Sequence, residues 1–514
     1  MSTALVLAAG AGTRLRSRTP KPAARLLGLP LLGRVLFALQ EAGITDAYVV
    51  LGHEADKVRG EIERIERLKI RVHWLYNPRW REPNGLSVLA AEKVLSEPFI
   101  LTMSDHIFDP EVVVALRRNV RRLRGIDLAV DRRVDQPIDL EDATKVRLEA
   151  DRIVAIGKSL TEYEAIDTGV FLASPALFEA LRASCAEGRA TLSGGVQRLA
   201  DAGMARVTEI GGRAWHDVDS PADLREAERK LLASVRKPTD GPVARYLNRP
   251  LSTAVSRQVL KTPITPTQVS LATLLLGLVS AGAAAVGGYV PFLVSGILFQ
   301  VGSILDGTDG EVAKLSFRTS RRGEWVDTLC DHIFYLAFLG GLTAGIYRSS
   351  LPSFYLWAGV LACVTAFVSL GNISFYLVRR NESGSALSVR YAFQEGDGLG
   401  SRITCMLQYL GKRDVMALLV LLLAVAGRLP VAVVLFGVLG TLVLLPATVR
   451  ANLSTLRSLW EPHGSVDEAG EWPPRRGSRS SFTGSPGWVR VCGRSSPEGS
   501  SGELRVTAEL AVGD

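Results

Sequence analysis

The chain has 514 residues and a formal net charge of +8, with 47% hydrophobic and 22% charged residues. This length exceeds what one domain usually holds, so we expect two or three domains. The five cysteines show no paired spacing, which excludes a disulfide framework and a zinc site of the usual pattern. Many basic residues stand in loops beside apolar runs, and this favours a membrane surface over nucleic acid as the partner of the positive charge.

The first part of the chain, up to about residue 240, predicts a soluble α/β fold. Short apolar runs that indicate buried strands alternate with stretches of helical period. The expected strands are Thr3–Ala8, Ala47–Leu51, Arg71–Leu75, Phe99–Met103 and Asp127–Val130, and the expected helices are Leu32–Ala42, Ala55–Leu68, Ser87–Leu95 and Pro110–Leu123. Such alternation is typical of a Rossmann-like, mostly parallel sheet covered on both faces. Because Met1 to Ala9 lacks the basic start of a secretion signal, we expect it to form the first strand.

The first expected strand leads into a glycine-rich loop with the sequence LAAGAGTRL. Ligands bind outside the carboxyl ends of the strands in such sheets. Gly10 and Gly12 let backbone N–H groups approach phosphates, and Arg14 and Lys21 supply positive charge for a triphosphate. The loop has no Walker ending and does not match GxGxxG, so it argues against P-loop and dinucleotide-binding folds. The residues expected to contact the nucleotide here are Leu7, Ala8, Ala9, Gly10, Gly12 and Thr13.

The stretch from Leu7 to Pro22 resembles the nucleotidyltransferase family that couples a nucleoside triphosphate to a phosphorylated sugar or polyol. Three later segments, NGLS, MSDH and WHDVDSP, follow in the order of that family. The resemblance implies catalytic roles for Arg14 and Lys21, base recognition by Asn84, Gly85 and Ser87, binding of Mg²⁺ (or Mn²⁺) by Asp105 and Asp219, and acceptor binding by Lys158 and Asp167.

The expected reaction is an in-line displacement at the α-phosphorus of the nucleotide, from which pyrophosphate leaves. The metal would neutralise charge between the triphosphate and the acceptor phosphate. Two simpler interpretations stay open. Asp219 would then only cap the helix that begins near Ser220, and Lys158 would be a solvated surface lysine.

The later part of the chain predicts an all-α, six-helix transmembrane domain over residues 268–455. Its apolar runs cover residues 268–286, 290–305, 328–347, 353–378, 414–427 and 430–448, and several are shorter than the ~20 residues that a full span needs. Basic residues gather in the loops after the second and fourth runs, so the positive-inside rule places the soluble domain and the C-terminal tail on the cytoplasmic side.

Two flanking segments complete the expected domain organisation. Residues 237–267 mix basic and apolar residues, which indicates an amphipathic juxtamembrane helix or else a solvated linker between the soluble domain at 1–236 and the first span. Residues 456–514 are rich in Ser, Gly, Pro and Arg and predict a disordered tail.

Four carboxylates interrupt the apolar runs: Asp306, Asp309, Asp327 and Asp331. Their spacing of three and then four residues puts each pair on one face of a helix. If the two helices stand side by side, the four side chains converge at the edge of a membrane, where unpaired charge is strongly disfavoured. The sequence therefore predicts a site for divalent cations.

This cluster resembles the DxxDGxxAR…GxxxDxxxD signature of the CDP-alcohol phosphatidyltransferase family, with one departure, because Lys314 stands where that family usually has Arg. Lysine cannot make the two parallel hydrogen bonds that arginine makes to phosphate, so phosphate binding by Lys314 stays open. The resemblance implies that Asp306, Asp309 and Asp327 bind metal, that Asp331 is the catalytic base beside the metal, and that Gly310, Ala313 and Lys314 contact the nucleotide. Arg379, Arg380, Arg390 and Arg402 either bind an acceptor phosphate or mark the topology.

Taken together, the two domains resemble the bifunctional inositol-1-phosphate cytidylyltransferase and di-myo-inositol-phosphate phosphate synthase family. That resemblance implies CTP, inositol 1-phosphate and CDP-inositol as ligands, a multi-pass location in the cell membrane among lipids, and a homodimer. A first alternative is transfer of the head group to a lipid hydroxyl. A second is a nucleotide-sensing domain on a transporter, which would have no need of the aspartate spacing.

Overall fold

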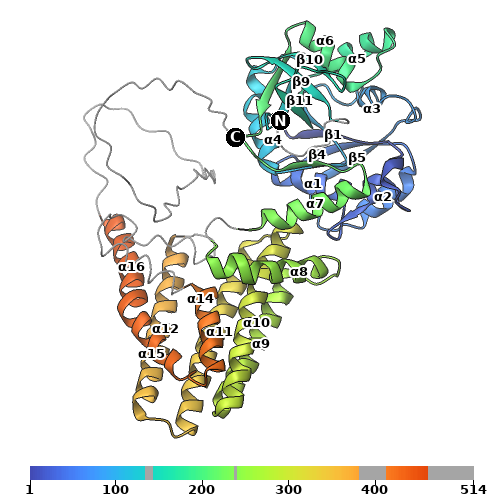
Figure 1. The fold of residues 1–514 in the computed structure, drawn as a ribbon. Coiled ribbons are helices and arrows are strands. Elements are labelled where there is room, and N and C mark those ends of the chain that lie inside the picture. The colour runs from blue at the N-terminus through green and yellow to red at the C-terminus, as the bar shows by residue number, and fades with distance from the viewer. Residues whose placement is uncertain (134–142, 237–239, 381–411, 461–514) are drawn as a thin grey trace, which may run out of the picture. The chain divides into compact units, whose positions relative to one another are not determined.

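The computed structural model of the chain describes residues 1–133, 143–236, 240–380 and 412–460 (Figure 1). The chain forms two compact units. The first unit combines the sheet domain with α8 (Arg249–Val259), the first part of α9, the end of α10 and the beginning of α11. The second unit contains the remaining parts of those three helices and the helices that follow them.

A nine-stranded mixed sheet with the order β5-β4-β1-β6-β11-β8-β12-β10-β9 forms the centre of the first unit. Its strands are β1 (Thr3–Ala8), β4 (Asp46–Leu51), β5 (Arg71–Tyr76), β6 (Phe99–Met103), β8 (Ile126–Asp131), β9 (Lys145–Glu149), β10 (Arg152–Gly157), β11 (Ala165–Ala173) and β12 (Ala205–Glu209). The strands β5, β4, β1 and β6 are parallel, whereas β11 runs antiparallel to both β6 and β8. Two small ribbons accompany the sheet, β2 (Arg25–Leu26) with β3 (Leu29–Pro30) and β7 (His106–Phe108) with β13 (Trp215–Asp217).

Helices cover both faces of the sheet (Figure 1). On one face lie α1 (Leu31–Glu41), α2 (Ala55–Glu63) and α4 (Pro110–Arg118), and on the other lie α3 (Gly85–Leu89), α5 (Ala176–Ala186) and α6 (Leu192–Asp201). Alternate residues of β1 enter the two cores, with Val6 in one and Leu5 in the other. This explains why the first strand reads as a continuous apolar run. A further helix, α7 (Pro221–Ser234), follows β13.

The five strands expected from the sequence are present with ends within one residue of the prediction. Four further strands, β9 to β12, were not predicted, and they make the sheet mixed beyond its parallel half. The longest of them, β11, carries Asp167 and Gly169, residue types that are depleted in strands. The expected helix Ser87–Leu95 is shortened to α3, and turns complete it.

The apolar part of the chain is helical. It contains α9 (Pro266–Val286), α10 (Tyr289–Leu315), α11 (Arg321–Arg348), α12 (Ser353–Arg380), α14 (Arg413–Val425), α15 (Val431–Leu439) and α16 (Leu445–Trp460), the last two joined by a π-type turn at Gly440–Leu444. Among the described residues, five helices are long and apolar enough to cross a membrane. The expected span at 414–427 is α14, whose 13 residues are fewer than the ~20 a full span needs. Residues 381–411, just before it, lie outside the described part.

Two observations concern the segments that flank the apolar helices. A π-type turn at Ala244–Asn248 and then α8 lie within the segment expected to be a juxtamembrane helix. Tyr246 and Leu251 are exposed there while Ser252 and Ser256 are buried, so the segment has two distinct faces. At the other end, α16 continues to Trp460, past the expected start of the tail, and residues 461–514 are outside the described part.

Candidate functional site

The glycine-rich loop after β1 lies against the side chain of Lys21. Gly12 has a φ of +58°, and a Cβ built on it would stand 2.3 Å from the Cβ of Lys21. Both the backbone angle and the close approach therefore require glycine. Gly10, in contrast, has nothing within 4 Å of such a Cβ, which leaves space beside the loop. Thr13 begins a single 3-10 turn that ends at Leu15.

Lys21 joins the two aspartates expected to bind metal. Its buried Nζ forms an ion pair with Asp105 and lies 2.5 Å from Oδ1 of Asp219. Arg14, which is exposed, donates from Nη2 to Oδ2 of Asp219 at 2.7 Å. Burial alone would lower the pKa of Lys21, but the nearby carboxylates of Asp105, Asp217 and Asp219 outweigh it and raise the pKa. Four of the residues predicted from the sequence thus meet at the carboxyl edge of β1 and β6.

Two further residues of this site were missed from the sequence, His106 and Asp217. They face each other in the β7–β13 ribbon. Nδ1 of His106 is 3.0 Å from Oδ1 of Asp105 and 3.7 Å from Oδ1 of Asp217. Burial lowers the pKa of His106, yet the carboxylates of Asp217 and Asp105 outweigh it and raise the pKa to about 9. Asp105, His106 and Asp217 each offer one possible metal ligand, and these atoms lie within 4.8 Å of one another. Their sequence signal is the pairing of SDH with WHD.

Asp167, expected to hold the acceptor, lies beside the same histidine. It accepts a hydrogen bond from the backbone N–H of Gly169 at 2.6 Å, and burial raises its pKa to about 6. Gly169 has a φ of +74°, and a Cβ there would come within 2.1 Å of the His106 ring. The bend in β11 therefore brings Asp167 towards His106. Lys158, the other expected acceptor residue, has an exposed side chain in the turn after β10.

The segment expected to recognise the base packs against the start of α6. Oδ1 of Asn84 accepts from the backbone N–H of Leu192 at 2.9 Å. A Cβ on Gly85 would lie 2.5 Å from the carbonyl oxygen of Ala190, and Ser87 accepts from Asn77 at 3.0 Å. These contacts fix the segment in place, and base recognition by it stays a prediction.

The start of α7 decides between the two interpretations of Asp219. The N-cap of α7 is Ser220, whose Oγ accepts from the backbone N–H of Asp223 at 3.2 Å. The carboxylate of Asp223 in turn accepts from the backbone N–H of Ser220 at 2.7 Å, which completes a capping box. Because Ser220 caps the helix, the carboxylate of Asp219 is directed to Lys21 and Arg14. The interpretation of Asp219 as a helix cap is wrong.

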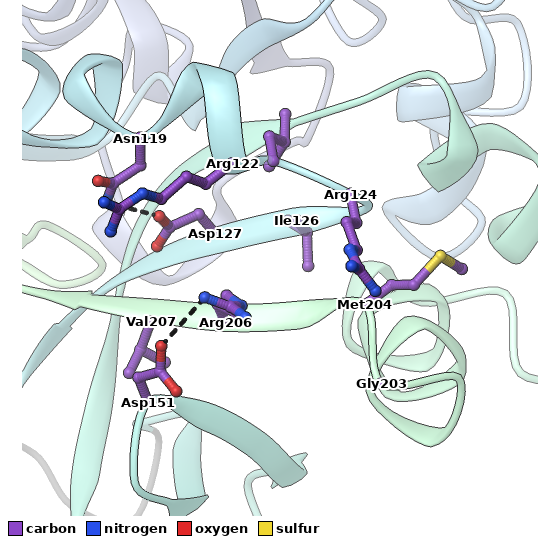
Figure 2. A pocket seen from close by; sticks show the side chains of 11 residues that line it. Asn119, Arg122, Arg124, Ile126, Asp127, Asp151, Gly203, Met204, Arg206 and Val207 are labelled. Atoms are coloured by element: carbon purple, nitrogen blue, oxygen red, sulfur yellow. Dashed lines mark hydrogen bonds and ion pairs between the residues drawn. The ribbon is translucent and has the colours of Figure 1, made fainter.

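A small cavity of about 90 Å³ lies at the amino ends of the strands, on the side of the sheet away from Lys21 (Figure 2). Its walls include Ile126 and Arg206, at the amino ends of β8 and β12, and Arg206 is paired with Asp151 at 3.3 Å. Ligands of parallel sheets bind at the carboxyl ends of strands. This cavity is therefore separate from the carboxylate group around Lys21.

The second carboxylate group lies on α10 and α11. Asp306, Asp327 and Asp331 each offer one oxygen, and these atoms lie within 4.8 Å of one another. Asp309 is buried, and its Oδ2 accepts from Oγ of Ser270 at 2.5 Å. The structure therefore brings together three of the four expected metal ligands, and the fourth, Asp309, is hydrogen-bonded both to Asp327 and to α9. Oxygen donors at this spacing suit a hard divalent cation such as Mg²⁺.

Beside these aspartates, the surface of α10 leaves free space at Gly310, whereas the side chain of Lys314 makes a hydrogen bond. A Cβ on Gly310 would meet nothing within 4 Å, and Ala313 is half-buried one turn further on. Lys314, expected to contact the nucleotide, donates instead from Nζ to the carbonyl oxygen of Ser234 at 3.0 Å. That oxygen belongs to the last residue of α7.

Glu311 was not singled out in the sequence, although it is among the most buried charged residues. Its Oε1 accepts from Arg249 at 2.8 Å and from Ser252 at 2.7 Å, and its Oε2 accepts from Ser256 at 2.6 Å. All three partners lie on α8. Since a buried charge must be paired and hydrogen-bonded, Glu311 fixes α10 against α8.

Comparison with known proteins assigns both parts of the chain. Residues 4–206 match the MobA-like NTP transferase domain family, and residues 263–444 match the CDP-alcohol phosphatidyltransferase family. A protein from Rubrobacter xylanophilus described as a bifunctional IPC transferase and DIPP synthase is 40% identical over 66% of this chain and 77% of its own length. Proteins of the same description from Thermococcus kodakarensis and Aquifex aeolicus are 34% and 29% identical, over 70% and 91% of this chain and 80% and 100% of their own lengths.

The first two relatives are similar to this chain across most of their length, through both the nucleotidyltransferase part and the membrane part. The order of the two matched parts also agrees with the resemblance inferred from the sequence. The chain belongs to the family of bifunctional IPC transferases and DIPP synthases.

Proposed function

We propose that the chain catalyses two successive reactions. CTP and inositol 1-phosphate first give CDP-inositol and pyrophosphate, and the phosphoinositol group of CDP-inositol then passes to a second inositol 1-phosphate with release of CMP. The observation that carries this proposal is that one chain of this family contains two separate carboxylate groups, Asp105 with Asp217 and Asp306 with Asp331. Each group lies on the motif of a different phosphoryl-transfer family.

In the first reaction, a phosphate oxygen of inositol 1-phosphate forms a bond to the α-phosphorus of CTP, and the bond to the bridging oxygen of pyrophosphate breaks. Arg14 and Lys21 hold the triphosphate by charge, and Asp167 orients the acceptor. Asp105 and Asp219, with His106 and Asp217 beside them, would hold Mg²⁺ (or Mn²⁺), which neutralises phosphate charge. To receive it, Lys21 has to release these carboxylates and turn to the phosphates.

In the second reaction, Asp331 takes the proton of the attacking inositol hydroxyl. The hydroxyl oxygen forms a bond to the phosphorus that carries inositol, and the bond to the CMP oxygen breaks. Asp306, Asp309 and Asp327 would hold the divalent cations that grip the diphosphate. The open surface at Gly310 and Ala313 leaves room for the nucleotide, and Lys314, which donates to Ser234 in this structure, would supply positive charge beside it.

The same proposal includes the location and the domains of the protein. Within the described part of the chain, five helices of membrane-spanning length agree with a multi-pass membrane protein, and the basic loops support a cytoplasmic position for the soluble domain and the tail. We propose a soluble domain at 1–236, a juxtamembrane segment at 237–267, a membrane domain at 268–455 with six spans, a tail at 456–514, and a homodimer surrounded by lipid. Of the four arginines proposed for acceptor phosphate, Arg390 and Arg402 lie outside the described residues. The structure describes only the backbone of Arg379 and Arg380, at the end of α12.

Membranes containing the full chain test the function directly. They are incubated with Mg²⁺, labelled inositol 1-phosphate and each of the four nucleoside triphosphates in turn, and the products are then extracted with organic solvent. The expected result is label in a water-soluble phosphodiester, with CTP only. Label in the organic phase would show a lipid acceptor instead, and absence of any CTP-dependent product would overturn both.

A further inference from the structure

The last turn of α10 is packed into the sheet domain of the first unit. Val312 and Leu315 are 1% and 4% exposed, and both belong to an apolar cluster whose other members lie mainly in the sheet domain. Those members are Leu15, Ala24, Leu26, Leu27, Leu31, Val218, Ala227, Val235 and Leu260. Leu15 ends the turn after the glycine-rich loop, and Val218 stands between Asp217 and Asp219. The helix that carries the second site therefore shares a core with the first.

The side chain of Arg34, on α1, donates a hydrogen bond to the backbone at the end of α10. Its guanidinium is 2% exposed and donates from Nη1 to the carbonyl oxygen of Leu315 at 3.0 Å. It also donates to the carbonyl oxygens of Leu26 and Leu27 at 2.8 and 3.2 Å. The last carbonyls of a helix lack partners within the helix and favour a cation. Arg34 supplies both a hydrogen-bond donor and a positive charge, and it joins the end of α10 to the β2–β3 turn.

Phe317, just beyond the helix, stacks on Phe37 of α1. The ring centroids are 5.3 Å apart with an interplanar angle of 13°. The guanidinium of Arg67 lies 4.6 Å from the centre of the Phe37 ring and donates to the carbonyl oxygen of Ser316. Phe317 has a φ of +55°, a left-handed conformation that is unfavourable in a residue other than glycine. The stack and the arginine hold it there.

Lys314 makes a third connection, to the last residue of α7. This helix of 14 residues begins at Pro221, two residues after Asp219, and extends over about 21 Å. Lys314 therefore lies at one end of α7 and the metal-binding segment of the first site lies at the other.

We propose that Arg34, Phe37 and Phe317 form a clamp that positions the last turn of α10 for the second reaction. By fixing the last turn, which carries Ala313, the clamp also positions the preceding turn with Gly310, and with them the surface on which the CDP-alcohol lies. Its residues act as positioning residues, since they touch α10 and its C-terminal residues and not the aspartates of either site. This inference rests on the proposed second reaction. A displacement of about 1 Å in a substrate-holding surface can reduce a rate by about 10²-fold.

Phe37→Ala, Phe317→Ala and the double variant of the full chain test the clamp. CMP release is measured from supplied CDP-inositol, so the first reaction is bypassed, and kcat and KM are determined separately. Each single variant is expected to raise KM for CDP-inositol about tenfold, and the double variant no further, because both changes break the same contact. Pyrophosphate release should stay within about twofold of the parent. Phe317→Tyr keeps the ring and should therefore keep the KM of the parent. The matched control is Phe367→Ala, at an aromatic residue that is 69% exposed.

Amide hydrogen exchange of residues 310–316 tests the same contact without substrate. The single variants should exchange about tenfold faster there than the parent, again without a further increase in the double variant. Additive effects of the two changes, unchanged KM and exchange, or an equal fall of both activities would overturn the clamp. If the parent releases no CMP while the exchange result holds, the proposed second reaction fails and the clamp stands as a structural contact.

Discussion

The two carboxylate groups of this chain are built differently. The group at the sheet edge contains its own cations, because Lys21 contacts Asp105 and Asp219 and His106 lies against Asp105. The group on the helices brings together Asp306, Asp327 and Asp331, with one oxygen of each within 4.8 Å of the others. Asp309 beside them is hydrogen-bonded to Asp327, to a hydroxyl and to a backbone N–H.

This difference implies different relations to a metal ion. At the sheet edge, a cation enters by competition with a lysine whose charge the carboxylates already stabilise, so the site keeps its shape in either state. On the helices, three carboxyl groups lie at short range, and a divalent cation that they share would reduce the repulsion between those that are ionised. Metal binding should therefore order the helical site more than the sheet site.

The largest effect is expected from Asp331→Asn, which removes the proposed base of the second reaction. General-base groups contribute about 10²–10⁴-fold, so CMP release from supplied CDP-inositol should fall about 10³-fold while pyrophosphate release continues. Both products are measured on the same membranes. Glu324→Gln, an exposed carboxylate on the same helix, is the control. Loss of both activities in Asp331→Asn would show that the two sites do not work separately.

Asp105→Ala should give the reverse pattern with a somewhat smaller loss. Pyrophosphate release should fall about 10²-fold, because a metal ligand and a partner of Lys21 and His106 are removed together. CMP release from supplied CDP-inositol should remain. Asp56→Ala, at an exposed carboxylate of α2, serves as the control. Full pyrophosphate release by the Asp105 variant would exclude it as a metal ligand.

The sequence predicted the parallel half of the sheet well because its strands are short apolar runs bounded by turn residues. It failed at β11, where Asp167 and Gly169 interrupt the strand pattern for the sake of the site. It did predict Asp306 and Asp309 on one face of a helix, and α10 continues from the apolar run to Leu315 through DGTDGEVAKL. Asp306 and Asp309 are thus part of α10, and the change from apolar to charged residues does not end the helix.

For the sites, the sequence identified the aspartates by their spacing but not the partners that orient them. His106 and Asp217 meet only through the β7–β13 ribbon, whose strands are more than a hundred residues apart in the chain. Glu311 was read as part of a motif, and its contacts with α8 depend on tertiary packing. Lys314 was predicted by resemblance to contact the nucleotide, and its hydrogen bond to Ser234 of α7 is a tertiary contact that the sequence did not indicate. Local patterns cannot show such long-range pairs.

Metal removal tests the contrast between the two groups at a moderate scale. Adding Mg²⁺ to chelator-treated protein should slow amide exchange of residues 306–331 about tenfold, since the cation relieves repulsion between carboxylates. Exchange of residues 103–108 should change by less than about twofold, because Lys21 and His106 already neutralise that group. Both segments are followed by mass spectrometry in one experiment. A larger change at 103–108 than at 306–331 would contradict the proposed difference.

The smallest effect is expected from Ser220→Ala, which removes the N-cap of α7. Loss of such a cap costs about 1 kcal/mol, or about 2–4 °C in the unfolding midpoint of a domain of this size. Since Ser220 follows Asp219, pyrophosphate release should fall about twofold, while CMP release stays unchanged. Ser220→Thr keeps the hydroxyl and should restore both values. A tenfold loss of pyrophosphate release would mean that the cap also sets the position of Asp219, and the sheet site would then depend on local helix structure as much as on Lys21.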